Sequence, residues 1–263
     1  MCRADQTGAI LYQYPRTQPV IKVTGLHKSF GAVKAVQGIS FEARNGEVTG
    51  LLGPNGAGKT TTLRMLYSLL PPDAGEIRID DLDPLRDAMA IKNTIGVVPD
   101  NRGLYARMTA RENIHYYGEL HGMTDAAIRK RIEEFVNILN MAEFIDRRAG
   151  GFSQGQRVKV AIARAMVHDP QTVLLDEPSN GLDVMSTREL RKYIQSLKTA
   201  GRSVVLSTHI MQEVTALCDR IIIIAAGKIA ADGTASELLH KSGCATIEDA
   251  FVKLIGTDEG LLA

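Results

Sequence analysis

The 263-residue sequence has few cysteines, no excess of either charge and no long apolar run. Its three cysteines, Cys2, Cys218 and Cys244, show neither the paired spacing of a metal site nor a disulfide framework, which favours a reducing compartment. Lysine and arginine number 31 against 30 aspartates and glutamates, so the net charge indicates neither nucleic acid nor an anionic membrane as a partner. A balanced net charge is still compatible with local basic patches. The strongest apolar run, residues 221–226, is far shorter than the roughly 20 residues that span a bilayer. If the protein serves a membrane, the spanning part is therefore another chain.

The N-terminal region offers no functional signal. Its first residues lack the charged-then-apolar pattern of a secretory signal, so we expect a cytoplasmic protein. Residues 1–19 mix polar residues and proline without a period and are predicted to be a tail or an extra edge segment. The sequence has neither internal repeats nor low-complexity tracts, and its length allows one sizeable core. We expect one domain with a subdomain.

The stretch Gly53–Thr60 has the full spacing of a phosphate-binding loop, G-x-x-x-x-G-K-[ST]. The apolar run before it predicts a buried strand, and leucines at helical spacing after it predict a helix. Glycines let backbone N–H groups turn toward phosphate oxygens, the helix start adds partial positive charge, and Lys59 adds a full charge. Thr60 is placed to hold Mg²⁺. The alternative is a glycine-rich turn without a ligand. The predicted nucleotide contacts here are Gly53, Pro54, Asn55, Gly56, Ala57, Gly58, Lys59, Thr60 and Thr61.

Hydrophobic patterns along the chain predict an α/β fold built on this loop. Two β-prone segments around a turn-rich stretch predict antiparallel strands ahead of the loop, and alternating strands and helices in the second half predict a mostly parallel sheet. Residues 109–151 carry helical patterns without a convincing strand and begin with a capping-box pair, Thr109 and Glu112, so we expect a helical insertion. The predicted strands are 20–23, 39–43, 48–52, 76–80, 94–98, 172–175, 203–207 and 220–225, and the predicted helices outside the insertion are 61–70, 156–168, 186–200, 235–239 and 247–255.

Two later strand ends carry groups suited to phosphate chemistry. Asp176 and Glu177 follow a buried strand, where Asp176 would hold Mg²⁺ through water and Glu177 would polarise the water that attacks the γ-phosphate. His209 closes the next apolar strand and would donate a hydrogen bond to the γ-phosphate. Lys59 completes the predicted catalytic group. Acidic turn residues and a structural histidine are the alternatives, and the other five histidines are interpreted as surface or packing residues.

A second anion site is predicted where a helix begins after Gly151-Phe152-Ser153-Gln154-Gly155-Gln156. The Ser153 hydroxyl, the Gly155 N–H group and the helix N-terminus all favour an anion. One nucleotide pocket does not need two phosphate grips. A helix start capped by serine is the alternative interpretation.

The order of these motifs resembles the nucleotide-binding subunit of ABC transporters over about residues 20–233. The matching segments are Gly53–Thr60, Ser153–Gln156, Leu174–Pro178, Ser179–Asp183 and His209. The resemblance implies a P-loop NTPase core with an antiparallel β subdomain and a helical insertion, which binds ATP with Mg²⁺. It also implies a head-to-tail dimer in which Ser153, Gly155 and Gln156 of one copy contact the ATP of the other, while residues 179–183 cross the interface. Phe30 matches the aromatic position that stacks on adenine, with a core aromatic as the alternative.

The sequence departs from the family pattern in two places. The usual Leu-Ser-Gly-Gly-Gln signature has Phe152 and Gln154 in place of its first Leu and first Gly, but it retains Ser153 and Gly155. Asp100 stands where the family normally places a Gln that reaches toward Mg²⁺ and the attacking water. A carboxylate about 4 Å from a phosphate is repelled by several kcal/mol at an effective dielectric near 20 unless a metal intervenes. We therefore expect Asp100 to face the metal or to swing away.

We expect the chain to divide into a tail at 1–19, a cassette at 20–233 with a helical subdomain at about 101–165, and a helical tail at 234–263. Residues 247–251 resemble the drug and sodium exporter branch, although amphipathic packing also explains them. The predicted protein is an ATPase that powers an exporter through a separate membrane-spanning permease, from the cytoplasmic face of the membrane and without nucleic acid. The alternatives are a soluble ABC ATPase acting on ribosomes or DNA, and a kinase with a phosphate loop.

Overall fold

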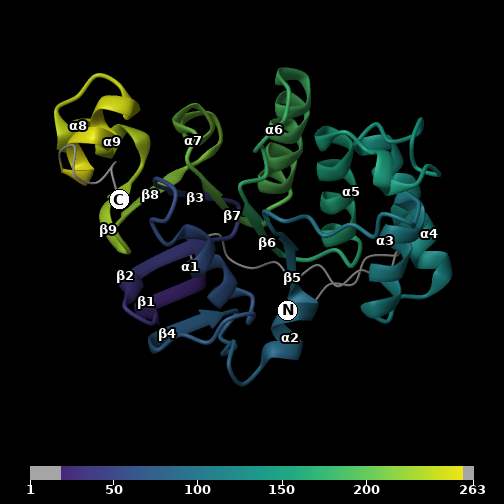
Figure 1. The fold of residues 1–263 in the computed structure, drawn as a ribbon, viewed down its shortest axis with the longest axis horizontal. Coiled ribbons are helices and arrows are strands. Elements are labelled where there is room, and N and C mark those ends of the chain that lie inside the picture. Colours follow the sequence, from purple (N-terminus) through teal and green to yellow (C-terminus); the bar gives the residue numbers. More distant parts are fainter. Residues whose placement is uncertain (1–18, 257–263) are drawn as a thin grey trace.

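The computed structural model describes residues 19–256 of the chain and has two β-sheets with helices around them (Figure 1). A three-stranded antiparallel sheet has the order β2-β1-β4, and a six-stranded sheet has the order β5-β6-β7-β3-β8-β9. The strands are β1 (Pro19–Phe30), β2 (Val33–Arg44), β3 (Val48–Leu52), β4 (Ala74–Ile79), β5 (Ile95–Val98), β6 (Thr172–Asp176), β7 (Ser203–Thr208), β8 (Arg220–Ala225) and β9 (Lys228–Gly233).

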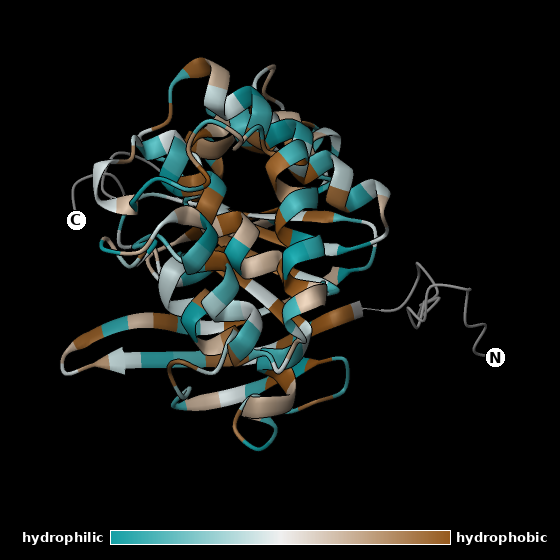
Figure 2. Cartoon of the chain, turned by 90° about the vertical axis from the view of Figure 1, so that its right-hand side faces the viewer, coloured by the Kyte–Doolittle hydropathy of each residue, from teal (hydrophilic) through white to brown (hydrophobic). Residues whose placement is uncertain are grey.

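Helices cover the larger sheet and form a separate group beyond its β5 edge. In Figure 1, α3, α4 and α5 lie together at the right, and α8 and α9 lie at the opposite end of the molecule. Along the helices in Figure 2, hydrophobic and hydrophilic residues alternate, as expected for segments with one buried face. The helices are α1 (Lys59–Leu66), α2 (Ala88–Thr94), α3 (Ala110–Leu120), α4 (Asp125–Ile138), α5 (Gln154–Met166), α6 (Val184–Thr199), α7 (Met211–Leu217), α8 (Ala235–Ser242) and α9 (Ile247–Ile255), with a 3₁₀ turn η1 (Ala149–Gly151).

The larger sheet has two buried faces, and β8 shows how each is filled. Ile222 and Ile224 join the cluster beneath the antiparallel sheet and α1, whereas Ile221 and Ile223 join the cluster that holds α8 and α9. This alternation follows from the two-residue period of a strand. Phe251 of α9 is buried against the second cluster, so packing accounts for the apolar face of the C-terminal helix.

The predicted α/β class and the parallel core are confirmed, because β5, β6, β7, β3 and β8 pair in parallel. The helical character of residues 109–151 and the capping box of Thr109 and Glu112 are also confirmed. Sequence patterns missed α2, α7 and the antiparallel edge strand β9, which are short elements of seven, seven and six residues. Within residues 19–256, no helix has the length and apolar content needed to cross a membrane.

Two local predictions were wrong. The turn-rich stretch predicted between two short strands is instead strand over most of its length, because β1 and β2 form a long hairpin that absorbs irregular register near Gly25. The helix predicted at 61–70 begins at Lys59 and ends at Leu66, since Ser68 adopts a positive φ of 59° and Leu69 is 65% exposed. In the hairpin, the tertiary pairing of the chain overrides the local pattern. The prediction for residues 1–18 lies outside the described residues.

Candidate nucleotide site

The loop between β3 and α1 is shaped by close backbone contacts. A Cβ atom on Gly53 would lie 2.2 Å from the Ile224 carbonyl oxygen, and one on Gly58 would lie 2.4 Å from the Ala35 carbonyl oxygen. Gly58 also has a φ of 106°, which disfavours residues with a side chain. As the N-cap of α1, Gly58 supplies no side-chain hydrogen bond. The first N–H groups of this helix are therefore suited to an anionic ligand.

Lys59 is buried at the start of α1, with its ammonium group turned into the loop. Its Nζ atom donates to the carbonyl oxygens of Gly53 at 2.8 Å and Pro54 at 3.1 Å, and lies 3.4 Å from Glu177 Oε1. Only 5% of the Lys59 side chain is exposed. A buried ammonium held by two carbonyls and one carboxylate is a preformed cation, to which a phosphate would be a stronger partner than a carbonyl.

The Thr60 hydroxyl and the Asp176 carboxylate carry oxygen atoms suited to Mg²⁺. Thr60 Oγ1 donates to Asp176 Oδ1 at 3.0 Å, and Ser207 Oγ donates to the same carboxylate oxygen at 2.5 Å. Carboxylate and hydroxyl oxygens are ligands that Mg²⁺ accepts when phosphates and water complete its shell. The described residues contain no cluster of three or more acidic, histidine or cysteine side chains that would hold a metal alone. The pair fits an Mg²⁺ ion that arrives with a nucleotide.

Glu177 and His209 meet across the ends of β6 and β7. His209 Nδ1 lies 2.9 Å from Glu177 Oε2, and the Glu177 N–H group donates to the Ser207 carbonyl oxygen at 3.1 Å and to its hydroxyl at 3.2 Å. Glu177 has a positive φ of 46°, a conformation that costs energy in a residue with a side chain. The surrounding bonds hold this conformation and direct the carboxylate at Lys59 and His209.

Lys59, Thr60, Glu177 and His209 line one cavity of about 340 Å³, whereas the predicted residues Gly53, Pro54 and Asp176 are not among its lining residues. Its lining brings together many of the residues predicted for nucleotide and metal binding, namely Asn55, Gly56, Ala57, Gly58, Lys59, Thr60, Thr61, Asp100, Glu177 and His209. Two further lining residues, Ala35 and Asn180, were not predicted as contacts. Asn180 lies inside the segment that the family resemblance assigned to the dimer interface. Ala35 has no signal of its own, because only the β1–β2 hairpin brings it to the loop.

The segment predicted as a second anion site lies elsewhere. Ser153 is exposed at the N-cap of α5, where its hydroxyl accepts a hydrogen bond from the Gln156 N–H group in a capping box. Gly155 packs against α6, since a Cβ atom there would lie 2.6 Å from Ser186 Oγ. Neither Ser153 nor Gln156 lines the cavity at the phosphate loop. The structure thus does not bring the two predicted phosphate grips together within one chain.

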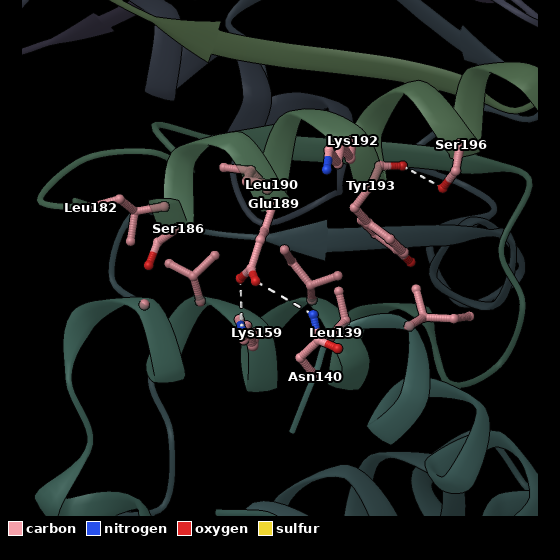
Figure 3. Close-up of a pocket in the computed structure, with 14 residues that line it drawn as sticks. Leu139, Asn140, Lys159, Leu182, Ser186, Glu189, Leu190, Lys192, Tyr193 and Ser196 are labelled. Carbon is pink, nitrogen blue, oxygen red and sulfur yellow. Dashed lines mark hydrogen bonds and ion pairs between the residues drawn. The ribbon is translucent and has the colours of Figure 1, made fainter. Parts of the chain in front are cut away.

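A separate groove of about 290 Å³ runs between α5 and α6 (Figure 3). Lys159 of α5 forms an ion pair with Glu189 of α6 at 2.8 Å, and the Asn140 amide donates to the same carboxylate at 3.4 Å. Of the residues predicted to contact nucleotide, only Gly155 lines this groove. It carries no phosphate-binding loop and is not the candidate site.

The comparisons with known proteins agree with this geometry. The sequence profile described as ABC transporter matches residues 36–180. The ABC transporter ATP-binding protein NatA of Bacillus subtilis is 47% identical over 211 residues, which are 80% of this chain and 85% of NatA. The chain belongs to the ABC transporter family. The Nod factor export ATP-binding protein I of Ralstonia nicotianae is 36% identical over 231 residues, which are 88% of this chain and 72% of that protein.

Solved ABC structures share the fold. The structure of an ATP-binding subunit of an ABC transporter superposes with a TM-score of 0.83 at 26% identity. The match covers 90% of this chain and 100% of the chain of that structure. A dimeric ATP-binding cassette in a post-hydrolysis state, bound to ADP and Pi, gives a TM-score of 0.74 at 25% identity and covers 81% and 98% of the two chains. The chain is an ATP-binding subunit of the ABC transporter family, and the prediction of an ATPase is confirmed.

Within this ABC subunit, Asp100, where the sequence departs from the family pattern, lies at the cavity, whereas Phe30 is not among the lining residues. Asp100 is exposed and lines the cavity together with Lys59 and Thr60, so its carboxylate is near the expected phosphates. Phe30 ends β1 with 51% of its surface exposed, which disagrees with a core aromatic and is compatible with adenine stacking. Ser207 was missed by sequence analysis, although a polar residue near the end of an apolar strand is the signal that indicates it.

Proposed function

We propose that this ABC subunit hydrolyses ATP to power export through a separate membrane-spanning chain, by closure of a head-to-tail dimer. The observation that carries the proposal is the separation of the two predicted phosphate grips. Lys59 and Thr60 line the cavity, whereas Ser153 is exposed at the start of α5 and outside it. A second copy in the opposite orientation would bring its own Ser153 over the open side of this cavity.

Each group near the cavity has one proposed task. Lys59 and the first N–H groups of α1 bind and orient the β- and γ-phosphates of the substrate. Thr60 and Asp176 would hold Mg²⁺, which supplies charge neutralisation at the phosphates. Glu177 accepts a proton from the attacking water, and His209 holds that carboxylate while offering a hydrogen bond to the γ-phosphate. A kinase must exclude water from its phosphate site, whereas Glu177 beside Asp176 is placed to use water. The arrangement therefore favours ATP hydrolysis over phosphoryl transfer to another substrate.

Mixing two inactive variants tests the composite site. Lys59→Ala removes the cation of the cavity but leaves Ser153 intact, and Ser153→Glu places a negative charge at the exposed helix start but leaves the cavity intact. Each variant alone is expected to be inactive. The mixture forms one complete site in mixed dimers and is expected to recover part of the ATPase rate. Full activity of Ser153→Glu alone, or no recovery in the mixture, would contradict the dimer mechanism.

The transport role has its own test. Purification of the chain from its native membranes is expected to recover an integral membrane protein, and the reconstituted pair is expected to move its cargo outward when ATP is present. The similarity to the Nod factor export ATP-binding protein I of Ralstonia nicotianae supports the outward direction. Stable sedimentation with ribosomes and no membrane partner would instead support a soluble ABC ATPase.

A further inference from the structure

Arg102 contacts three segments that are distant in sequence. It lies in the loop after β5, two residues beyond Asp100. Its Nη2 atom donates to the carbonyl oxygens of Pro178 at 3.2 Å and Asn180 at 3.3 Å, and its Nη1 atom donates to Gln154 Oε1 at 3.2 Å. One guanidinium therefore joins the loop that carries Asp100, the loop after Glu177 and the start of α5.

The backbone around Arg102 is also bonded to α5. Arg164 of α5 donates to the carbonyl oxygens of Gly103 at 2.9 Å and Arg102 at 2.5 Å, and its guanidinium lies 4.4 Å from the ring centre of Tyr117. Arg164 is only 5% exposed. The loop is thus bonded to α5 both through Arg164 and through the contact of Arg102 with Gln154, so a displacement of the loop is passed to this helix.

Both ends of this connection reach functional positions. Asp100 and Asn180 line the cavity together with Lys59. Burial lowers the pKa of the Arg102 guanidinium, and the Asp100 carboxylate acts in the opposite direction. At the other end, Gln154 directly follows Ser153, the N-cap of α5.

We propose that Arg102 is a positioning residue that couples the nucleotide cavity of one chain to that chain's own Ser153–Gln156 segment. The inference rests on the proposed dimer, in which this segment serves the ATP bound by the other copy. When nucleotide draws Asp100 toward the phosphates and metal, the Arg102 guanidinium moves with its loop, and the bonds to Gln154 and Asn180 pass the movement on. The coupling links the two ATP sites.

The hydrogen-bond pattern of Arg102 suits a movable link. Its Nε atom is buried and has no hydrogen-bond partner within the described residues. A buried N–H group without a partner costs free energy. Reorienting this guanidinium therefore breaks fewer hydrogen bonds than reorienting one whose donors are all paired. The bond to Gln154 is also a property of this sequence, because the glycine of the usual family signature has no side chain that accepts it.

Hydrogen exchange without nucleotide tests the link inside the full-length chain. Arg102→Ala removes three hydrogen bonds, and amides in 152–158 and 178–183 are expected to exchange roughly tenfold faster. Gln154→Ala removes only the Nη1 bond at an exposed helix position and is expected to affect mainly 152–158. Arg107→Ala is the matched control, since Arg107 is exposed on the same loop and forms no hydrogen bond or ion pair within residues 19–256.

ATP-driven dimerisation then tests the coupling, in a Glu177→Gln background that slows hydrolysis. Arg102→Ala is expected to bind ATP within about twofold of the parent at low protein concentration but to require roughly tenfold more protein to dimerise. Arg102→Lys keeps the charge and one bond, and is expected to restore part of the loss. Combining Gln154→Ala with Arg102→Ala is expected to add little to Arg102→Ala alone, because both break the same link.

The outcomes separate this inference from the proposed function. If the Glu177→Gln parent does not dimerise with ATP, the proposed dimer fails and the inter-site coupling fails with it. If the parent dimerises and Arg102→Ala matches both the parent and Arg107→Ala in exchange and dimerisation, Arg102 has no positioning role and only the inference is overturned. If Arg102→Ala does not fold, the exposed Gln154→Ala variant decides, and its equality with the parent in both measurements also overturns the inference.

Discussion

Replacing Glu177 with glutamine tests the centre of the proposed site. Glu177 is 8% exposed, and its carboxylate lies 3.4 Å from Lys59 Nζ and 2.9 Å from His209 Nδ1. Glutamine has nearly the same shape, so Glu177→Gln removes the charge and the proton acceptor while the fold is retained. The variant is expected to hydrolyse ATP more slowly and to bind it more tightly.

The two magnitudes follow from different contacts. Loss of a positioned general base typically slows a reaction by about 10²- to 10⁴-fold. The pair with Lys59 at 3.4 Å has a Coulomb attraction of about 5 kcal/mol at an effective dielectric of 20. Desolvation offsets most of the attraction in such a pair, and we estimate that about 1 kcal/mol remains. Since Glu177→Gln frees Lys59 for the phosphates, ATP is expected to bind roughly fivefold more tightly.

Single-turnover hydrolysis and titration with ATP measure the two effects separately. Glu143→Gln is the control, because Glu143 is exposed and its substitution removes the same charge at a position that does not line the cavity. A Glu177→Gln variant that hydrolyses ATP at the parent rate would refute the role of Glu177 as the base. Weaker ATP binding by the variant would refute the argument that Glu177 and phosphate compete for Lys59.

Three other groups give independent predictions. Asp100→Asn removes a negative charge from the rim of the cavity, and it is expected to change the ATPase rate and its dependence on Mg²⁺ concentration. Ser179→Ala breaks the 2.5 Å bond from Ser179 Oγ to the buried Glu213 carboxylate, and it is expected to lower the free energy of unfolding by about 1.5–3 kcal/mol in urea titrations. Burial, followed by the charge of stacked His121, lowers the pKa of His168 from 6.5 to about 4. As the pH falls, the unfolded chain binds the proton near pH 6.5 and the folded chain only near pH 4. The free energy of unfolding is therefore unaffected by His168 above pH 6.5 and is expected to fall by about 3 kcal/mol between pH 6.5 and pH 4.

Each of these predictions has a result that contradicts it. For Asp100→Asn, an unchanged rate and an unchanged Mg²⁺ dependence would show that the carboxylate faces neither metal nor phosphate. For Ser179→Ala, a double-mutant cycle with Glu213→Gln that gives no coupling energy would show that the short bond adds nothing to stability. For His168, the His168→Gln variant is the reference in urea titrations from pH 7 to pH 4, and equal loss of stability in the two proteins would refute the assignment.

The sequence by itself determined the chemistry of the phosphate loop, because that chemistry depends on residues adjacent in the chain. Gly53–Thr60 specifies a strand, a tight turn and a helix start within one short segment, and the structure has β3, the loop and α1 in that order. Local patterns also indicated the parallel strands, whose apolar runs are buried on both faces. The family and the ATPase activity followed from the order of several such motifs.

Only the tertiary structure decided which of these motifs meet. Parallel pairing of β6 and β7 places Asp176 opposite Ser207 and brings Glu177 to His209, contacts that no local pattern encodes. The same packing leaves Ser153 outside the cavity, although both segments had the character of phosphate grips. The hydrogen bonds of Arg102 to the Pro178 and Asn180 carbonyl oxygens could not be predicted from the sequence either. Every residue has a backbone carbonyl, so such bonds depend on how the chain folds and not on residue type.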